Sequence, residues 1–419
     1  MHSVRTISCL AGASSLKRRA DAARLIFIAG AVSAASLLGA CLGRPEAAGP
    51  SGGTGVRQSS ASDGTPSAAV FRGSEVRSLE PWSFNGVPGK IITTDHFTIY
   101  TTETSNAITD RVPKFLEVAM RQYTTAFGPG AALQPPPGRL ESFIMGNRQQ
   151  WKEITLTMLG KQGAEMLNIT AGGFAVGGRA FLFDIGIAST FFVAAHEGWH
   201  QYTQRTFAEP MPVFLEEGVA TYMEGHRWDG ADVQFLPWAN LERFEQLRTA
   251  GQGGRLMSIR DLIETTPRRL IQEPGDAAVT YYAQLWSLLH FLNEGDGGVY
   301  KPALQRLLRD AQAGQLSQNV AAQLTMNERG GMLARRQGNA VFRAYFDRDV
   351  DGFNKRYQAF VQQIVRTGAR DWITQGRSPL PVAVAPMVSP AAPLFAERLA
   401  IPARGVRRVS VPAAPVSVN

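Results

Sequence analysis

The sequence predicts an α+β fold, with short strands in the first half of the ordered chain and helices in the second. Apolar and polar residues alternate over short runs up to Asp184, with two helical patterns between them. From Val213 onward, apolar residues recur almost entirely at the 3.6-residue spacing of helices. The chain has 419 residues, 44% of them hydrophobic, which is enough to bury one large core or two modest ones.

The N-terminal 40 residues have the pattern of an export signal. Five basic residues precede an apolar run from Leu25 to Ala40, which is short for a transmembrane helix and typical of a signal-peptide core. The run ends in Leu38-Gly39-Ala40-Cys41, which resembles a bacterial lipobox. That resemblance implies cleavage before Cys41, lipidation of this cysteine and a stable membrane anchor. Leu42, in place of an aspartate, then favours the outer membrane of the cell envelope, facing the periplasm or the cell surface. The alternative is a simple cleaved signal.

Two further segments lie outside the predicted folded body. Residues 41–70 are rich in Gly, Ser, Ala, Pro and Thr and predict a flexible tether. Residues 377–419 predict a Pro/Ala-rich, disordered tail. Residues 1–40 and 377–419 each hold five basic residues and one acidic residue, so the ends account for the net charge of +8. The body is near neutral, which argues against a nucleic-acid partner.

The body begins near Phe71, and its elements follow in order. Residues 90–102 predict one or two strands containing His96, which we expect to be a surface or hydrogen-bonded residue rather than a ligand. A helix over 108–127, a strand over Leu140–Met145 and a helix around 151–159 come next. Two short strands bracketed by glycines follow, the second ending at Asp184. The chain has only Cys9 and Cys41, which leaves the body without a disulfide or a thiolate metal ligand.

The segment that carries chemistry is His196-Glu197-Gly198-Trp199-His200. Residues four apart lie on one face of a helix, so His196 and His200 can both bind one zinc ion at about 2.0–2.1 Å. Glu197 lies beside the metal, where it can take a proton from a metal-bound water. The helical period begins near Ser189 and Thr190, whose hydroxyls we expect to cap the helix. Gly198 costs about 1 kcal/mol in a helix, so we expect it to let another element approach closely.

A second helical pattern, 213–224, carries Glu216 and Glu217 after a turn marked by two prolines. Neighbouring helical residues point about 100° apart, so only one of these two can face the metal. An HExxH motif followed by a Glu-Gly pair resembles the gluzincin branch of zincin metallopeptidases, in particular peptidase-MA-like families. The resemblance makes Glu217 the third zinc ligand. Glu224, two turns further on the same face, is expected to hydrogen-bond His196 or His200.

The resemblance implies a zincin catalytic domain with a small mixed sheet in residues 71–225 and a helical subdomain closing the cleft in residues 226–376. The strand Ala180–Asp184 would form the sheet edge to which extended substrates add, although an ordinary buried strand is as compatible with its sequence. Tyr282 is the first candidate for the donor that stabilises the reaction's oxyanion; Tyr281 and His290 are the alternatives, and core packing is an equally good explanation of these rings. His226 is expected at a partly exposed helix end. The helical periods cover residues 241–249, 259–265, 281–292, 300–311 and 341–365.

Together these features predict a lipid-anchored zinc metallopeptidase of the bacterial envelope that cleaves peptides or proteins. Glu197 would be the general base, with zinc held by His196, His200 and Glu217. The alternative is a non-catalytic metal-binding or interaction lipoprotein that keeps the same fold.

Overall fold

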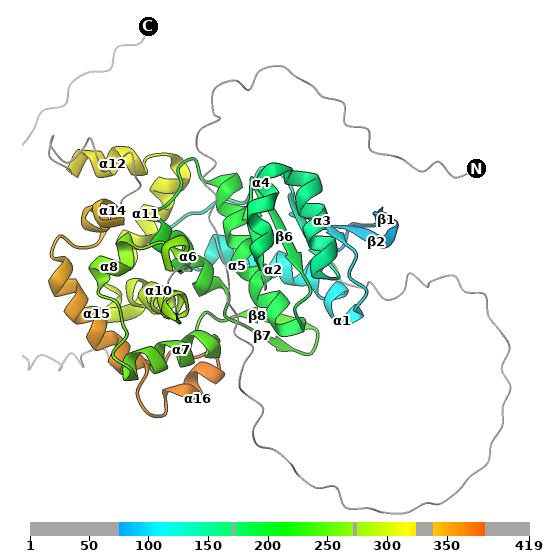
Figure 1. Ribbon diagram of the computed structural model, residues 1–419. Helices are drawn as coiled ribbons and strands as arrows, with labels where there is room; N and C mark the ends of the chain where they lie inside the picture. The colour runs from blue at the N-terminus through cyan, green and yellow to red at the C-terminus, as the bar shows by residue number, and fades with distance from the viewer. Residues whose placement is uncertain (1–74, 170–171, 271–274, 324–337, 382–419) are drawn as a thin grey trace, which may run out of the picture. The chain divides into compact units, whose positions relative to one another are not determined.

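The structure, a computed structural model, describes residues 75–169, 172–270, 275–323 and 338–381. The predicted signal peptide, Cys41, the tether and nearly all of the predicted tail therefore lie outside the described residues. The described chain up to Leu380 belongs to one compact unit with a mixed α and β composition (Figure 1). One hydrophobic core includes residues from both predicted subdomains, such as Phe115 and Leu289, so their separation at residue 225 stays a prediction.

A six-stranded mixed sheet forms the first half of the unit. Its strand order is β1-β2-β3-β4-β6-β5, with β3, β4 and β6 parallel and the outer pairs antiparallel. The strands are β1 Ser78–Phe84, β2 Val87–Thr93, β3 Phe97–Thr101, β4 Leu140–Met145, β5 Gly173–Val176 and β6 Arg179–Phe183. The predicted strand over Leu140–Met145 is confirmed, and residues 90–102 contain the end of β2 and the whole of β3.

The expectation that Ala180–Asp184 forms the sheet edge is wrong. These residues fall almost wholly in β6, which lies between β4 and β5, and β5 is the outer strand. The reason is the tight hairpin at Gly177 and Gly178, whose φ angles of 60° and 77° only glycine adopts without strain. Either arm of such a hairpin can be the outer strand, and here β6 pairs with β4, which leaves β5 outside.

The two faces of the sheet are covered by different helices. On one face, Tyr100, Phe143, Phe181 and Phe174 stack across β3, β4, β6 and β5 with ring centroids 4.9–5.0 Å apart, and Trp151 of α3 packs on this ladder. On the other face lie α2 and α5, which carry Phe115 and Phe191 into the main core. The helices of this half are α1 Asn106–Thr109, α2 Val112–Thr125, α3 Arg148–Leu159, α4 Lys161–Ala164 and α5 Ile187–Thr206, with a 3₁₀ turn η1 at Glu165–Asn168.

The second half of the unit is mainly helical, as predicted. α10 is its centre and packs closely on α6, because Gly218 has no side chain: a Cβ there would come within 2.2 Å of Cδ2 of Leu289. The helices are α6 Val213–Met223, α7 Leu241–Gln252, α8 Ile259–Glu264, α9 Pro267–Leu270, α10 Ala277–Glu294, α11 Lys301–Ala313, α12 Leu316–Gln323, α14 Gly338–Tyr345, α15 Val350–Ile364 and α16 Ala369–Thr374, with a 3₁₀ turn η2 at Gly295–Gly298.

Two expectations about this half are corrected. Residues 341–365 form two helices instead of one, because Asp349 caps a new helix by accepting a hydrogen bond from Gly352 N at 2.9 Å. A β-hairpin also interrupts the helices, with β7 at His226–Asp229 and β8 at Asp232–Phe235. Within the described residues, no helix has both the length and the apolar character needed to span a bilayer.

Candidate metal centre

Helix α5 supplies the two histidines. It begins at Ile187, earlier than the predicted caps, and its N-cap position is Gly186. Thr190 lies inside the helix, and its hydroxyl donates to Oδ1 of Asp184 at 3.2 Å and accepts from Ile185 N at 3.1 Å. The hydroxyl therefore stabilises the turn that leads from β6 into α5, although it does not cap the helix.

Gly198 has the role expected of it. A Cβ at this position would come within 2.3 Å of the Tyr123 hydroxyl, which donates a hydrogen bond of 2.8 Å to the carbonyl of Ala195. Tyr123 belongs to α2 and is fully buried. The glycine thus allows α2 to reach the backbone of α5 in the turn that carries His196.

Helix α6 brings Glu217 to the two imidazoles. Oε2 of Glu217 lies 3.5 Å from Nε2 of His196 and 3.7 Å from Nε2 of His200. One ligand atom from each residue lies within 4.8 Å of the other two, and all three side chains are buried. Among the described residues, both Nε2 atoms and both Glu217 oxygens lack a hydrogen-bond partner. Buried polar atoms without partners are costly, so the convergence of ligand atoms from these three residues is an arrangement that a bound ion would stabilise.

The donor set and its spacing fit a metal ion. In a tetrahedral site with bonds of about 2.0–2.1 Å, two ligand atoms are separated by about 3.3–3.4 Å. The observed 3.5 and 3.7 Å are too long for hydrogen bonds and close to this ligand separation. His196, His200 and Glu217 therefore form a buried group that could hold a metal ion.

Each histidine has its own carboxylate on the far side of the ring. Nδ1 of His196 lies 2.8 Å from Glu224 Oε1, and Nδ1 of His200 lies 3.0 Å from Glu216 Oε1. An ionised carboxylate only accepts, so in both neutral rings Nδ1 carries the proton and Nε2 keeps its lone pair for a metal. Glu224 occupies the place predicted for it. Glu216, which the sequence left as a rival for Glu217, instead orients His200 and also accepts from the Thr203 hydroxyl at 2.6 Å.

Glu224 is held by a network that the sequence did not indicate. Arg243 binds it through two hydrogen bonds of 2.9 and 3.0 Å, and Asn240 Nδ2 donates to it at 2.8 Å. Burial raises the pKa of Glu224, but Arg243 and the hydrogen bond with His196 outweigh it and bring the pKa to about 2. Glu224 is therefore ionised under all ordinary conditions. Asn240 and Arg243 belong to the start of α7, and no spacing in the sequence connects them to Glu224.

The remaining charges of the centre influence one another strongly. Burial raises the pKa of Glu217, yet its contacts with His196 and His200 leave the pKa below its usual value. Burial alone would lower the pKa of both imidazoles, but the surrounding carboxylates raise it in each case. Without a metal, the electrostatics of the centre thus favour protons on both rings.

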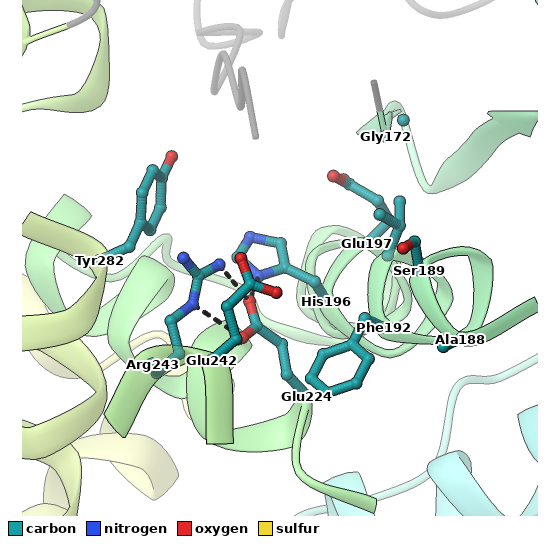
Figure 2. Close-up of a pocket in the computed structure, with 12 residues that line it drawn as sticks. Gly172, Ala188, Ser189, Phe192, His196, Glu197, Glu224, Glu242, Arg243 and Tyr282 are labelled. Atoms are coloured by element: carbon teal, nitrogen blue, oxygen red, sulfur yellow. Dashed lines mark hydrogen bonds and ion pairs between the residues drawn. The ribbon is translucent and has the colours of Figure 1, made fainter. Parts of the chain in front are cut away.

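A cavity of about 140 Å³ opens beside the centre (Figure 2). His196 and Glu197 face it from α5, together with residues of α7, α10 and the start of β5. Oε2 of Glu197 is buried and has no hydrogen-bond partner within the ranges that the structure describes, and burial raises the pKa of this carboxyl. Glu197 is thus placed beside the three ligands and outside their set, as the HExxH spacing predicts. The lining residues are Gly172, Gly173, Ala188, Ser189, Phe192, Val193, His196, Glu197, Glu224, Glu242, Arg243 and Tyr282.

Of the three candidate oxyanion donors, only Tyr282 lines the cavity. Its hydroxyl has no hydrogen-bond partner in the described part of the chain. Its ring centroid lies 6.1 Å from that of His196 and 5.3 Å from the Arg243 guanidinium. The Tyr281 hydroxyl donates to the Thr265 carbonyl at 3.1 Å and is occupied. His290 uses Nδ1 with Glu294 and Nε2 with Pro237 and stacks on Trp238, so it packs in the core.

Two other histidines lie away from the centre. His96 is hydrogen-bonded through Nδ1 to Glu117 at 2.7 Å and partly exposed, as expected. The expectation for His226 is wrong: it is buried at the start of β7, and its Nδ1 donates to the Glu224 carbonyl at 2.8 Å. The reason is the hairpin, which directs the chain after Glu224 back against Phe115.

No protein-family model matches the chain, and no significant match to a curated protein is found. The buried His-His-Glu group is the feature on which a function has to be argued.

Proposed function

We propose that the protein is a zinc-dependent hydrolase of peptide bonds with a zincin fold of the gluzincin type. One observation carries the proposal: atoms of His196, His200 and Glu217 that have no partner among the described residues converge on one point, and Glu197, whose Oε2 also has none, lines the cavity beside them together with His196. The order of the elements, a mixed sheet followed by α5 and α6, supports the fold assignment.

Zinc is the proposed metal because the donors are two imidazoles and a carboxylate, a set that zinc hydrolases use with one position left open. When bound, zinc would polarise a substrate carbonyl and make a water molecule more acidic. The same donors also suit iron(II), so the metal has to be identified by analysis.

The chain's own residues have the following roles in this proposal. Glu224 and Glu216 fix the tautomers of His196 and His200 through their Nδ1 protons. Glu197 accepts the proton of the attacking water, and its raised pKa suits the later delivery of that proton to the leaving amine. Tyr282 faces the cavity with a free hydroxyl that can donate to the developing oxyanion.

The test combines metal analysis with a cleavage assay on the full chain. We expect about one zinc per chain by mass spectrometry, and hydrolysis of a mixed peptide library by the wild type but not by Glu197→Gln. Zinc bound at this ratio without any difference in cleavage would favour the non-catalytic module, and absence of metal from the purified, zinc-supplemented protein would refute the enzyme.

We also propose that the protein is a lipid-anchored protein of the bacterial envelope, from the lipobox-like residues ending at Cys41. Cys41→Ser should abolish incorporation of labelled fatty acid and release the protein from membranes. Persistence of the label in that variant would refute lipidation at Cys41.

A further inference from the structure

The cavity beside the metal centre lies between α5 and α7. Ala188 and Phe192 of α5 lie on one side together with Ser189 and Glu197, whereas Glu242 and Arg243 of α7 lie on the opposite side with Tyr282 (Figure 2). A substrate that fills the cavity therefore meets the charges of α7. Which of these charges are available for binding follows from their existing partners.

Arg243 is not available. Its Nε and Nη2 donate to Glu224 at 3.0 and 2.9 Å, its Nη1 donates to Gln246 Oε1 at 3.2 Å, and its side chain is only 17% exposed. Glu224 is likewise occupied, because its oxygens accept from Arg243, Asn240 and His196. The two charges neutralise each other, and Arg243 has little capacity left for a substrate carboxylate.

Glu242 is in the opposite situation. It is exposed at the cavity, and its only hydrogen bond in the described part of the chain is accepted from the neutral Gln246 amide at 2.9 Å. It makes no ion pair with any cation of the described residues. Its carboxylate therefore keeps free acceptor capacity toward the cavity.

The charge balance of the cavity then leaves Glu242 without a compensating cation. A zinc ion at His196, His200 and Glu217 would add two positive charges to that of Arg243, and the carboxyl groups of Glu197, Glu216, Glu217 and Glu224 are all buried around them, so the centre would carry no excess of positive charge for Glu242. We propose that Glu242 makes the cleft prefer substrates with a positively charged group beside the cleaved bond, either an α-ammonium group or a Lys or Arg side chain. This inference rests on the proposed peptidase function.

A simpler explanation of Glu242 exists and can be separated from this one. Glu242 lies in the first turn of α7, where a carboxylate also stabilises the helix through its dipole. Stabilisation of the helix would affect all peptides equally. A difference in binding between charged and neutral peptides requires the Glu242 carboxylate to act on the peptide itself, through direct contact or through its electric field at the cavity.

The experiment measures peptide binding to the zinc-loaded, full-length Glu197→Gln protein by fluorescence anisotropy. The probes are one labelled peptide series in which a single residue is Lys or norleucine and the amino terminus is free or acetylated. Glu242→Gln is compared with Glu245→Gln, a control on the same helix whose carboxylate is already paired with Arg248 and Arg370. We expect Glu242→Gln to weaken the binding of cationic peptides about two- to fivefold at low salt and to leave the binding of neutral peptides unchanged. The difference in binding between wild type and variant should shrink as salt is added. Glu242→Lys should reverse the preference.

The arms distinguish the two sources of charge. Loss of the preference on acetylation identifies the α-ammonium group, and loss on changing Lys to norleucine identifies the side chain. Equal binding of charged and neutral peptides by the protein with Glu242 intact, or equal effects of the Glu242 and Glu245 variants, would overturn the proposal. If the wild type cleaves peptides without a charge preference, this inference fails alone; if charged peptides bind but none is cleaved, the proposed function fails instead.

Discussion

The close approach of Tyr123 to Gly198 predicts that Gly198→Ala destabilises the protein, against the usual preference of helices for alanine. The added Cβ would lie 2.3 Å from the Tyr123 hydroxyl and 3.3 Å from Cζ of its ring. Tyr123 of α2 is fully buried, so the added methyl group would have to displace a ring that lies inside the core.

The magnitude follows from three contributions. Alanine gains about 1 kcal/mol over glycine in a helix interior. Overpacking a buried site costs roughly 1–3 kcal/mol. Moving the hydroxyl away from the Ala195 carbonyl loses a buried hydrogen bond worth about 1 kcal/mol. The expected net loss in the free energy of unfolding is therefore about 2 kcal/mol.

Urea denaturation in the presence of a chelator measures this loss without a contribution from metal binding. The control is a double-mutant cycle with Tyr123→Phe, which removes the clashing oxygen and leaves the ring. In the Tyr123→Phe background, Gly198→Ala should lower the free energy of unfolding only slightly or should raise it. A stabilising effect in the wild type, or the same cost in both backgrounds, would refute the reasoning.

Further predictions concern the metal and its surroundings. Zinc at 100 times its dissociation constant should stabilise the fold by about 2.7 kcal/mol, seen as a higher Tm, and Glu217→Gln should remove most of this gain. Arg243→Met should weaken zinc binding by about 10–100-fold in a chelator competition, because Glu224 then holds His196 less firmly. The pKa of Glu224 is lowered to about 2, so its contribution to stability is present above the ordinary value of 4.5 and is lost as the pH falls from there toward 2. The free energies of unfolding of wild type and Arg243→Met, measured at several pH values, should therefore converge over that range. A constant difference between them would contradict this prediction. Tyr282→Phe should lower kcat by about 10²–10³ with little change in KM and, because the hydroxyl has no partner, no loss of stability.

Much of the fold could be predicted from periodicity, and the parts that were missed have specific causes. β1 contains Pro81, which argues against a strand, but a proline is tolerated because β1 is an edge strand. The β7–β8 hairpin had a visible signal in Asp229-Gly230, with Gly230 at a φ of 59°, and the helical pattern around it hid this signal. The identity of the outer strand could not be predicted, because it depends on long-range pairing.

The residues of the candidate site likewise include some that the sequence could predict and some that it could not. Residues linked by local spacing could be found from the sequence, because His196, Glu197 and His200 share one helix, and Glu217 lies in another helix of which Glu224 is the C-cap residue. The partners that fix them come from elsewhere in the chain and have no spacing to reveal them. Tyr123 lies on α2, and Arg243 and Asn240 lie on and beside α7.

The buried charges also explain why such a centre is compatible with folding. Four carboxyl groups, those of Glu197, Glu216, Glu217 and Glu224, are buried together, and among the described residues Arg243 is the one guanidinium paired with them, through Glu224. Burying several carboxylates against one cation would be strongly unfavourable, so further positive charges are needed. Without a metal they come as protons on His196 and His200, whose pKa values are raised for this reason. A bound dication would supply the same two charges and leave both rings neutral, so the total charge of the centre would not change. The protein therefore does not need a different fold for the two states, and metal affinity should depend on pH through the two protons that the ion displaces.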